Sequence, residues 1–234
     1  MTSAVWRRDR AFYIAMSLAA IASVFAGFAR TYFLRSRFSP NTLPFYVHVH
    51  GAAFTTWIAL FVAQTVLIAS RRTDVHRKVG WVAAGLAALM IPIALTTAVI
   101  SGQRNVAEGN VVGARTFLAV PIFSMAVFLV LMAAAVYYRD RPETHKRLML
   151  LATINILDAA IARWPLAFVS STTWMYYVIT DVFILAAIGY DAASRKRISP
   201  AYLWGGLLIV AAQFGRELIG RTGAWQAFAQ TIVG

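Results

Sequence analysis

Residues 45–70 read FYVHVHGAAFTTWIALFVAQTVLIAS. The run is long enough to cross a bilayer, which needs about 20 predominantly apolar residues in a helix. It begins with His48 and His50, two of the four histidines in the chain. Because polar groups are expensive in lipid and are placed there for a reason, this stretch predicts a membrane span that carries a polar site at its start.

The rest of the chain repeats this apolar pattern. Of its 234 residues, 60% are hydrophobic and only 13% are charged, whereas soluble domains carry about 25% charged residues. We therefore expect an all-α, seven-helix membrane bundle that forms one transmembrane domain over residues 1–234. The expected spans are 11–34, 45–70, 79–100, 117–138, 148–169, 172–190 and 200–219. The polar loop 101–116 is expected to be mobile, and an amphipathic tail follows the last span.

Charge sets the orientation. The chain holds 22 Lys and Arg against 9 Asp and Glu, for a net charge of +13. The N-terminus and the turns after the second, fourth and sixth spans hold 14 of these bases, which leaves 22 − 14 = 8 elsewhere. The positive-inside rule then places the N-terminus in the cytoplasm and the C-terminus outside. The excess predicts contact with the lipid bilayer and its anionic headgroups rather than with nucleic acid, since no nucleic-acid-binding motif is present.

Two turns on the basic side share one pattern. Residues 72–79 (RTDVHRKV) and 141–148 (RPETHKRL) both run basic, any, acidic, any, His, basic, basic, apolar. The acidic residue falls in a first helical turn, where the helix dipole favours it. Helix capping and topology explain everything except His76 and His145. These two either do no more than cap the starts of their helices or share a metal, a haem or a proton.

The outer histidines differ, because they lie on one helix. Two residues apart corresponds to about 200° of helix rotation, so His48 and His50 point to opposite sides and cannot chelate one ion together. We expect His50, seven residues before Trp57, to face the interior. Gly51 would let another backbone or a ligand approach closely.

Two carboxylates fall deep inside predicted spans. Asp158 and Asp181 lie roughly 14–16 Å from the starts of their predicted spans. At that depth, near the middle of the bilayer, a charged side chain costs at least ~2.5–3.5 kcal/mol. They should face the interior with partners. One reading is structural ion pairing, for example of Arg163 with Asp158 or Glu217. The other is a polar cavity open to the outer side, whose further members are Arg30, Gln64, Asn155, Arg163, Tyr177, Gln213, Arg216 and Glu217.

Several chemistries suit these groups. His48 or His50 with Asp158 and Asp181 offers N and O ligands to a divalent metal, and His76 with His145 is a second candidate metal pair. The same groups could relay protons, and the arginines suit an anion. A single haem b on the inner pair is the weaker alternative. The absence of Cys excludes disulfides and thiolate-ligated metals.

Four short motifs resemble a known group of proteins: HVHG at 48–51, DVHRKVGW at 74–81, THKRLM at 144–149 and GFARTY at 27–32. They are similar to a widespread group of uncharacterised bacterial multi-pass membrane proteins, with the motifs HxHG and [DE]xH[RK][RK]. The resemblance implies a bacterial inner-membrane location and no activity. It also implies that the four histidines and Arg30 are shared polar positions of that group.

Three functions remain open at this point. The first hypothesis is a buried His/Asp/Arg site with a metal-binding or redox-associated role. The second is a small-solute transporter or proton-coupled carrier. The third is an accessory subunit of a membrane complex, with a second copy or other subunits as partners. No P-loop, Rossmann, zincin or hydrolase motif is present, so whether the protein is an enzyme stays open.

Overall fold

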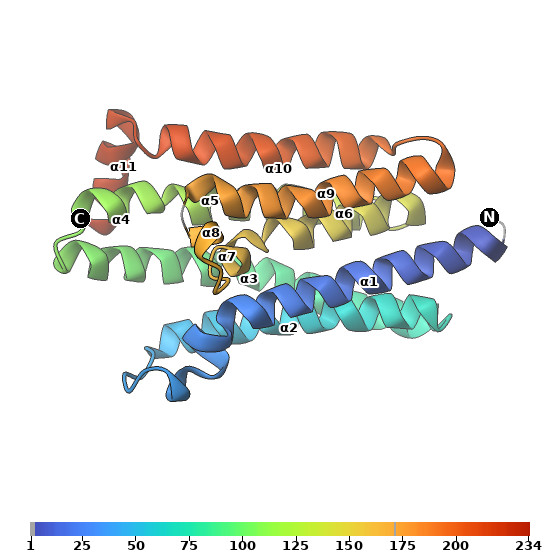
Figure 1. The fold of residues 1–234 in the computed structure, drawn as a ribbon, viewed down its shortest axis with the longest axis horizontal. Coiled ribbons are helices and arrows are strands. Elements are labelled where there is room, and N and C mark those ends of the chain that lie inside the picture. Colours follow the sequence, from blue (N-terminus) through green and yellow to red (C-terminus); the bar gives the residue numbers. More distant parts are fainter. Residues whose placement is uncertain (1–2, 171) are drawn as a thin grey trace.

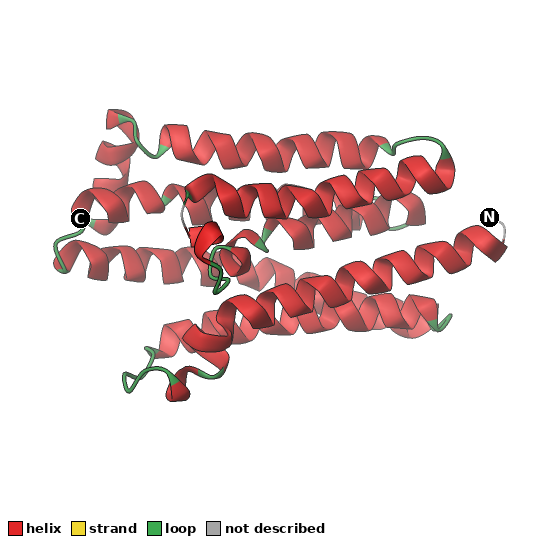
Figure 2. Ribbon diagram, in the orientation of Figure 1, coloured by secondary structure: helices red, strands yellow, loops and turns green. Residues whose placement is uncertain are grey.

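The part of the protein that the structure describes is predominantly helical. The computed structural model describes residues 3–170 and 172–234, and no strand occurs among them (Figure 2). The helices are α1 (Ser3–Phe28), α2 (Phe45–Ala69), α3 (Thr73–Ala107), α4 (Val111–Phe117), α5 (Ala119–Tyr137), α6 (Pro142–Asn155), α7 (Asp158–Ile161), α8 (Ala167–Ser170), α9 (Thr173–Arg195), α10 (Pro200–Ile219) and α11 (Gly223–Val233). A π-helical turn, Ala29–Phe33, prolongs α1.

Among the described residues, five helical stretches are long and apolar enough to cross a membrane. They are Trp6–Phe33, Phe45–Ala69, Thr73–Ala107, Val111–Tyr137 and Trp174–Arg195. The prediction of an all-α fold with several helices able to cross a membrane, by their length and composition, is therefore confirmed. The long helices lie roughly along one axis, and the two ends of the chain lie at opposite ends of it (Figure 1).

The predicted span 148–169 is wrong as a continuous helix. Helix α6 ends at Asn155, and the helices described between it and α9 are the short α7 and α8. The amides of Ile156 and Leu157 bond to carbonyls three residues back, which closes α6 with a tight turn. Further along, Pro165 lacks an N–H and disfavours helical geometry at Trp164. The chain thus has a break between helices in this region.

The predicted mobile loop 101–116 is also wrong. Helix α3 continues to Ala107 and α4 begins at Val111, so only residues 108–110 separate them. The expected amphipathic tail forms α11, but it folds back on the chain. Its Trp225 indole donates to the carbonyl of Arg115 at 2.8 Å, and its buried Ala229 and Val233 pack with Leu118. Packing against α11 explains why most of residues 101–116 are helical and do not form a mobile loop.

Helix α5 lies at the centre of the bundle, in contact with α3, α6 and α10. Its Phe128 is fully buried and meets the ring of Trp57 edge-on, with centroids 5.4 Å apart. Close packing also explains Gly51, where a Cβ would lie 2.5 Å from the ring of Tyr32. The neighbour that Gly51 admits is thus an aromatic side chain from the π-helical turn.

Candidate functional site

A polar cluster lies inside the bundle, where α6 ends and α7 begins. We call it the buried centre; its members are Ser124, Asn155, Asp158, Tyr177, Asp181, Gln213, Arg216 and Glu217. They come from α5, α6, α7, α9 and α10. Asp181 lies fourteen residues before Arg195, so it is ~21 Å along α9 from the end of that helix. The buried centre is therefore far from the basic end of the molecule.

Arg216 organises the buried centre. Its side chain is 2% exposed, and its guanidinium is ion-paired with Asp158. The same guanidinium donates to the hydroxyl of Tyr177 at 2.9 Å and to the hydroxyl of Ser124 at 2.8 Å. Tyr177 in turn donates to Glu217 at 2.8 Å. Arg216 thus uses all three of its nitrogens and fixes three other helices around itself.

The break after α6 positions two members of the buried centre. Asn155, the last residue of α6, donates from Nδ2 to the carbonyl of Ser124 at 2.9 Å. Asp158 begins α7 and is brought to Arg216 by the turn between the two helices. Irregular backbone at membrane depth is tolerated only where it is buried in protein or lines a polar space. Here it is buried among the charged and amide side chains.

Three polar atoms at the buried centre make no hydrogen bond of normal distance and angle to any described residue. They are Asp158 Oδ1, Asp181 Oδ1 and Gln213 Nε2, all buried. The amide of Gln213 lies beside both carboxylates, and the two carboxylates act on each other electrostatically. Asp158 and Gln213 are 5% and 2% exposed. Because buried polar groups are nearly always satisfied, these three atoms mark a place for a proton, an ion or a polar solute.

The charges at the buried centre do not balance. Asp158 pairs with Arg216, and Glu217 lies 3.6 Å from the exposed Arg221. Asp181 has no cation within ion-pair distance among the described residues. Three carboxylates thus face two guanidiniums, one carboxylate in excess. Asp181 is partly buried, and a carboxylate without a cation in such a setting is costly unless it is protonated or takes up a cation.

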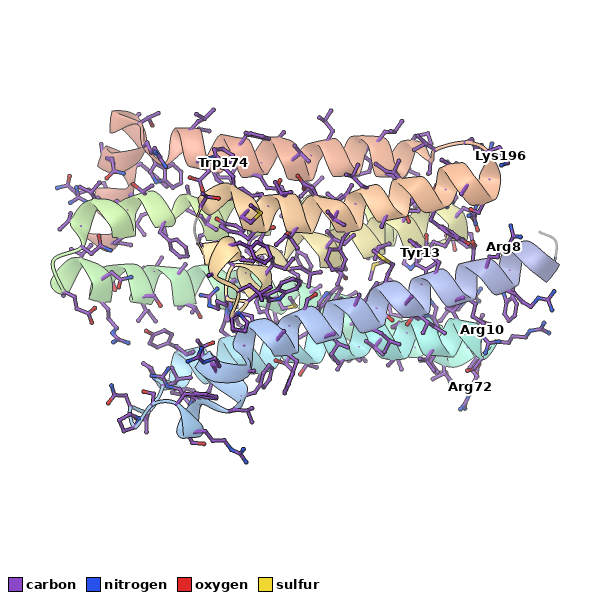
Figure 3. The ribbon with its side chains drawn as sticks, in the orientation of Figure 1. Arg8, Arg10, Tyr13, Arg72, Trp174 and Lys196 are labelled. Carbon is purple, nitrogen blue, oxygen red and sulfur yellow. The ribbon has the colours of Figure 1, made fainter. Side chains whose placement is uncertain are left out.

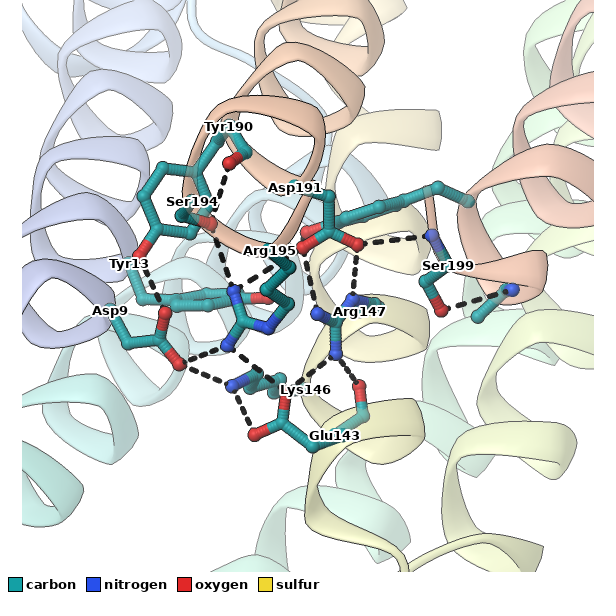
Figure 4. A network of polar contacts seen from close by, with 12 residues as sticks. Asp9, Tyr13, Glu143, Lys146, Arg147, Tyr190, Asp191, Ser194, Arg195 and Ser199 are labelled. Atoms are coloured by element: carbon teal, nitrogen blue, oxygen red, sulfur yellow. Dashed lines mark hydrogen bonds and ion pairs between the residues drawn. The ribbon is translucent and has the colours of Figure 1, made fainter. Parts of the chain in front are cut away.

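A second polar cluster, which we call the end network, lies at the basic end of the bundle (Figure 4). Its acids are Asp9, Glu143 and Asp191, and its bases are Lys146, Arg147 and Arg195. Lys146 lies 2.6 Å from both Asp9 and Glu143. Arg147 makes a bidentate pair with Asp191 at 2.7 and 2.8 Å. The three bases balance the three acids.

The end network ties α1 to α6 and α9. Arg195 of α9 lies 2.6 Å from Asp9 of α1 and 3.0 Å from Glu143 of α6, and Tyr190 donates to Asp9. Burial raises the pKa of Glu143, but the hydrogen bonds from Lys146 and Arg147 outweigh it and hold that pKa below its ordinary value. Glu143 therefore stays ionised at neutral pH and supports the closed network.

Sequence reasoning missed the end network as a unit. The pairs Glu143–Arg147 and Asp191–Arg195 are four residues apart, a spacing that signals contact along one helix face. That spacing could have indicated the local pairs. Nothing in it indicates that Asp9, from the first helix, closes the network, because this contact joins residues more than 130 positions apart.

The outer histidines lie outside the buried centre. His48 is exposed, whereas His50 is partly buried and stacks on Phe54 with centroids 4.3 Å apart. This is the arrangement that their two-residue spacing predicts. Neither ring joins Asp158 and Asp181 in a metal site, because no group of three or more His, Asp or Glu side chains in the described chain is placed to hold a metal ion. The predicted metal set His48, His50, Asp158 and Asp181 is therefore not assembled.

The inner histidines do come together. His76 of α3 and His145 of α6 have ring centroids 6.3 Å apart. The Nδ1 of His145 lies 2.8 Å from the carbonyl oxygen of Ala135, and the Nδ1 of His76 is buried without a partner. The matching motifs of the two turns thus bring their histidines into one place.

Three predicted cavity residues lie elsewhere. Arg163 donates to the carbonyl of Ala159 at 2.6 Å and lies over the ring of Phe28, so the predicted pairing of Arg163 with Asp158 or Glu217 is wrong. Arg30 is exposed and lies over the ring of Phe38. Gln64 donates to the carbonyl of His76 at 3.3 Å and thus belongs to the opposite end of the molecule.

Comparison with known proteins adds no further constraint: no family model, no curated protein and no solved structure matches the chain. The class of protein therefore follows from the fold and the site, as a helical membrane protein with a buried charged centre.

Proposed function

We propose that the protein is a proton-coupled carrier of small solutes, in which the buried centre takes up and releases a proton. The observation that carries the proposal is the excess carboxylate, Asp181, beside Gln213 and the Asp158–Arg216 pair. Ionisable residues inside membrane segments most often mark substrate or proton pathways.

The break between α6 and α7 supports the same proposal. Transporter sites lie near mid-membrane, where discontinuous helices present polar backbone and side chains to the cargo. Here the break carries Asn155 and Asp158 into contact with α5 and α10. A proton on Asp181 would neutralise the excess charge. Release of that proton would restore the negative charge of Asp181 and so change how strongly the buried centre attracts a polar solute.

The first hypothesis from the sequence, a metal-binding or redox role at the outer histidines, receives less support. Its four residues are not assembled, and Asp158 is already occupied by Arg216. The setting that we propose is a bacterial inner membrane with the basic end in the cytoplasm. Figure 3 shows Arg8, Arg10, Arg72 and Lys196 at that end. In this proposal α10, and the broken segment from α6 to α8, complete a seven-element bundle.

Infrared spectroscopy of the purified protein tests proton binding directly. A protonated carboxylic acid has a carbonyl band that disappears when it ionises. We expect a pH titration to show such a band in the native protein and to show its loss in Asp181→Asn. The matched control is Asp140→Asn, whose side chain is 86% exposed and whose replacement should leave the band unchanged.

Proton movement is tested in reconstituted vesicles adsorbed on a solid-supported membrane. A jump of external pH should drive a transient current through the native protein, and Asp181→Asn should abolish it. If Asp181→Asn left the carboxyl band of the native protein unchanged, and the native protein gave no current, proton coupling at the buried centre would be refuted.

A further inference from the structure

The inner histidines form a second candidate site, independent of the buried centre. We propose that His76 and His145 bind a transition-metal ion of tetragonal preference, Cu(II) or Ni(II), between their rings. The two residues come from different helices, so the site depends on the fold and not on local sequence.

The nitrogen that His145 offers is fixed by its hydrogen bond. A carbonyl oxygen only accepts, so Nδ1 of His145 carries the proton that it donates to Ala135. The Nε2 of the neutral ring then carries a free lone pair. A backbone carbonyl that orients a histidine in this way is the usual support of a metal-binding imidazole.

Two further buried atoms near this place have no hydrogen-bond partner in the part of the chain that the structure describes. They are Nδ1 of His76 and Oε1 of Gln64. Gln64 is held beside His76 by its own bond from Nε2 to the His76 carbonyl. The side chains thus offer imidazole nitrogens and an amide oxygen, a ligand set that suits Cu(II) and Ni(II).

The separation of the rings selects the coordination geometry. With metal–nitrogen bonds of about 2.0–2.1 Å, the centre of each ring lies roughly 3.2 Å from a shared ion. Two rings on that ion have centres about 6.4 Å apart when they are trans and about 5.2 Å apart at the tetrahedral angle. The observed 6.3 Å, between rings whose planes are 84° apart, is close to the trans value; a trans pair occurs in square-planar and tetragonal sites and not in tetrahedral zinc sites.

Neighbouring positive charge does not oppose this site as strongly as the sequence suggests. Lys146 follows His145, but its ammonium is held 2.6 Å from Asp9 and from Glu143. Arg147 is held by Asp191 and Glu143. Because the end network is balanced, it leaves little net charge beside the two imidazoles. Arg77 and Lys78 are exposed and screened by solvent and salt.

Electron paramagnetic resonance of the full-length protein, freed of any affinity tag and titrated with Cu(II), tests the proposal. We expect one Cu(II) per chain with a tetragonal spectrum that shows coupling to two imidazole nitrogens. His76→Gln and His145→Gln should each weaken Cu(II) binding at least tenfold in calorimetry. The matched control is His48→Gln. His48 is exposed and lies at the start of α2, away from Gln64, so this variant should bind Cu(II) as the native protein does.

Several results would overturn the proposal. They are the absence of Cu(II) binding, a spectrum without two nitrogens, or binding that both inner variants retain. A haem absorption band in the purified native protein would also overturn it, because the two histidines would then bind the iron of a porphyrin and not a free ion. Since the spectrum of the native protein counts the nitrogens directly, the test stands even if a variant fails to fold. Failure here leaves the proton test at Asp181 unaffected, because the two sites share no residue.

Discussion

Gly27 of α1 and Ala160 of α7 meet backbone to backbone: a Cβ placed on Gly27 would lie 2.0 Å from the carbonyl oxygen of Ala160. This contact holds the first helix against the break between α6 and α9. Because the obstructing atom belongs to the backbone, no side-chain rotation could relieve the overlap.

Gly27→Ala should therefore destabilise the protein by about 1–3 kcal/mol, the usual range for overpacking. Unfolding in detergent measures the change. The matched control is Gly85→Ala in α3, where a Cβ meets nothing within 4 Å. There the higher helix propensity of Ala should make the change neutral or stabilising. Equal stability of the two variants would contradict the close approach of α1 and α7.

Arg216→Met should cost about 3–5 kcal/mol, because it leaves the buried Asp158 without its cation. Replacing both partners, as Arg216→Met with Asp158→Leu, should recover much of that loss. Arg104→Gln is the control, since Arg104 and Glu108 lie 3.7 Å apart with both side chains more than half exposed. It should change the free energy of unfolding by less than about 1 kcal/mol.

Asp9→Asn should loosen the start of α1, because Asp9 accepts from Lys146, Arg195 and Tyr190. Hydrogen exchange of the first turns of α1 should become faster, while exchange in α10 stays the same. Asp74→Asn, an exposed acid in the first turn of α3, is the control and should leave α1 protected. Unchanged exchange in the Asp9 variant would show that other contacts hold this helix.

Acid should weaken the end network. The pKa of Glu143 is lower in the folded protein than in the unfolded chain, so its contribution is present above about pH 4.3, its ordinary pKa. It is lost as the pH falls through the lowered value. The melting temperature should therefore fall on acidification, and Glu143→Gln should show a smaller fall. An identical pH profile for the variant would contradict this assignment.

Local sequence was sufficient for the ends of several helices. Asp74 and Glu143 lie in the first turns of α3 and α6, as the dipole argument predicts. It was insufficient for the segment 148–169, whose hydropathy is that of a span. Hydropathy averages over a window and does not register the tight turn after Asn155.

The buried centre was only partly predictable. Depth along the chain identified Asp158 and Asp181 as carboxylates that need partners, and Gln213, Arg216 and Glu217 as candidates. The same depth argument predicted Arg163 as a cation for Asp158, which is wrong. Arg163 and Arg216 both lie at a depth in their predicted spans that would allow the pair. Only the packing of α10 against α5 and α6 directs Arg216, and not Arg163, at that carboxylate.

The sequence by itself determined that the chain is helical and apolar enough for a membrane, since those properties follow from composition and hydropathy alone. It also determined that His48 and His50 diverge, because a helix fixes the angle between residues two apart. Tertiary structure alone decided that His76 meets His145, that Asp9 closes the end network and that Asp181 is left without a cation. All three depend on which side chains meet between helices that are distant in the sequence, and this depends on how the helices pack.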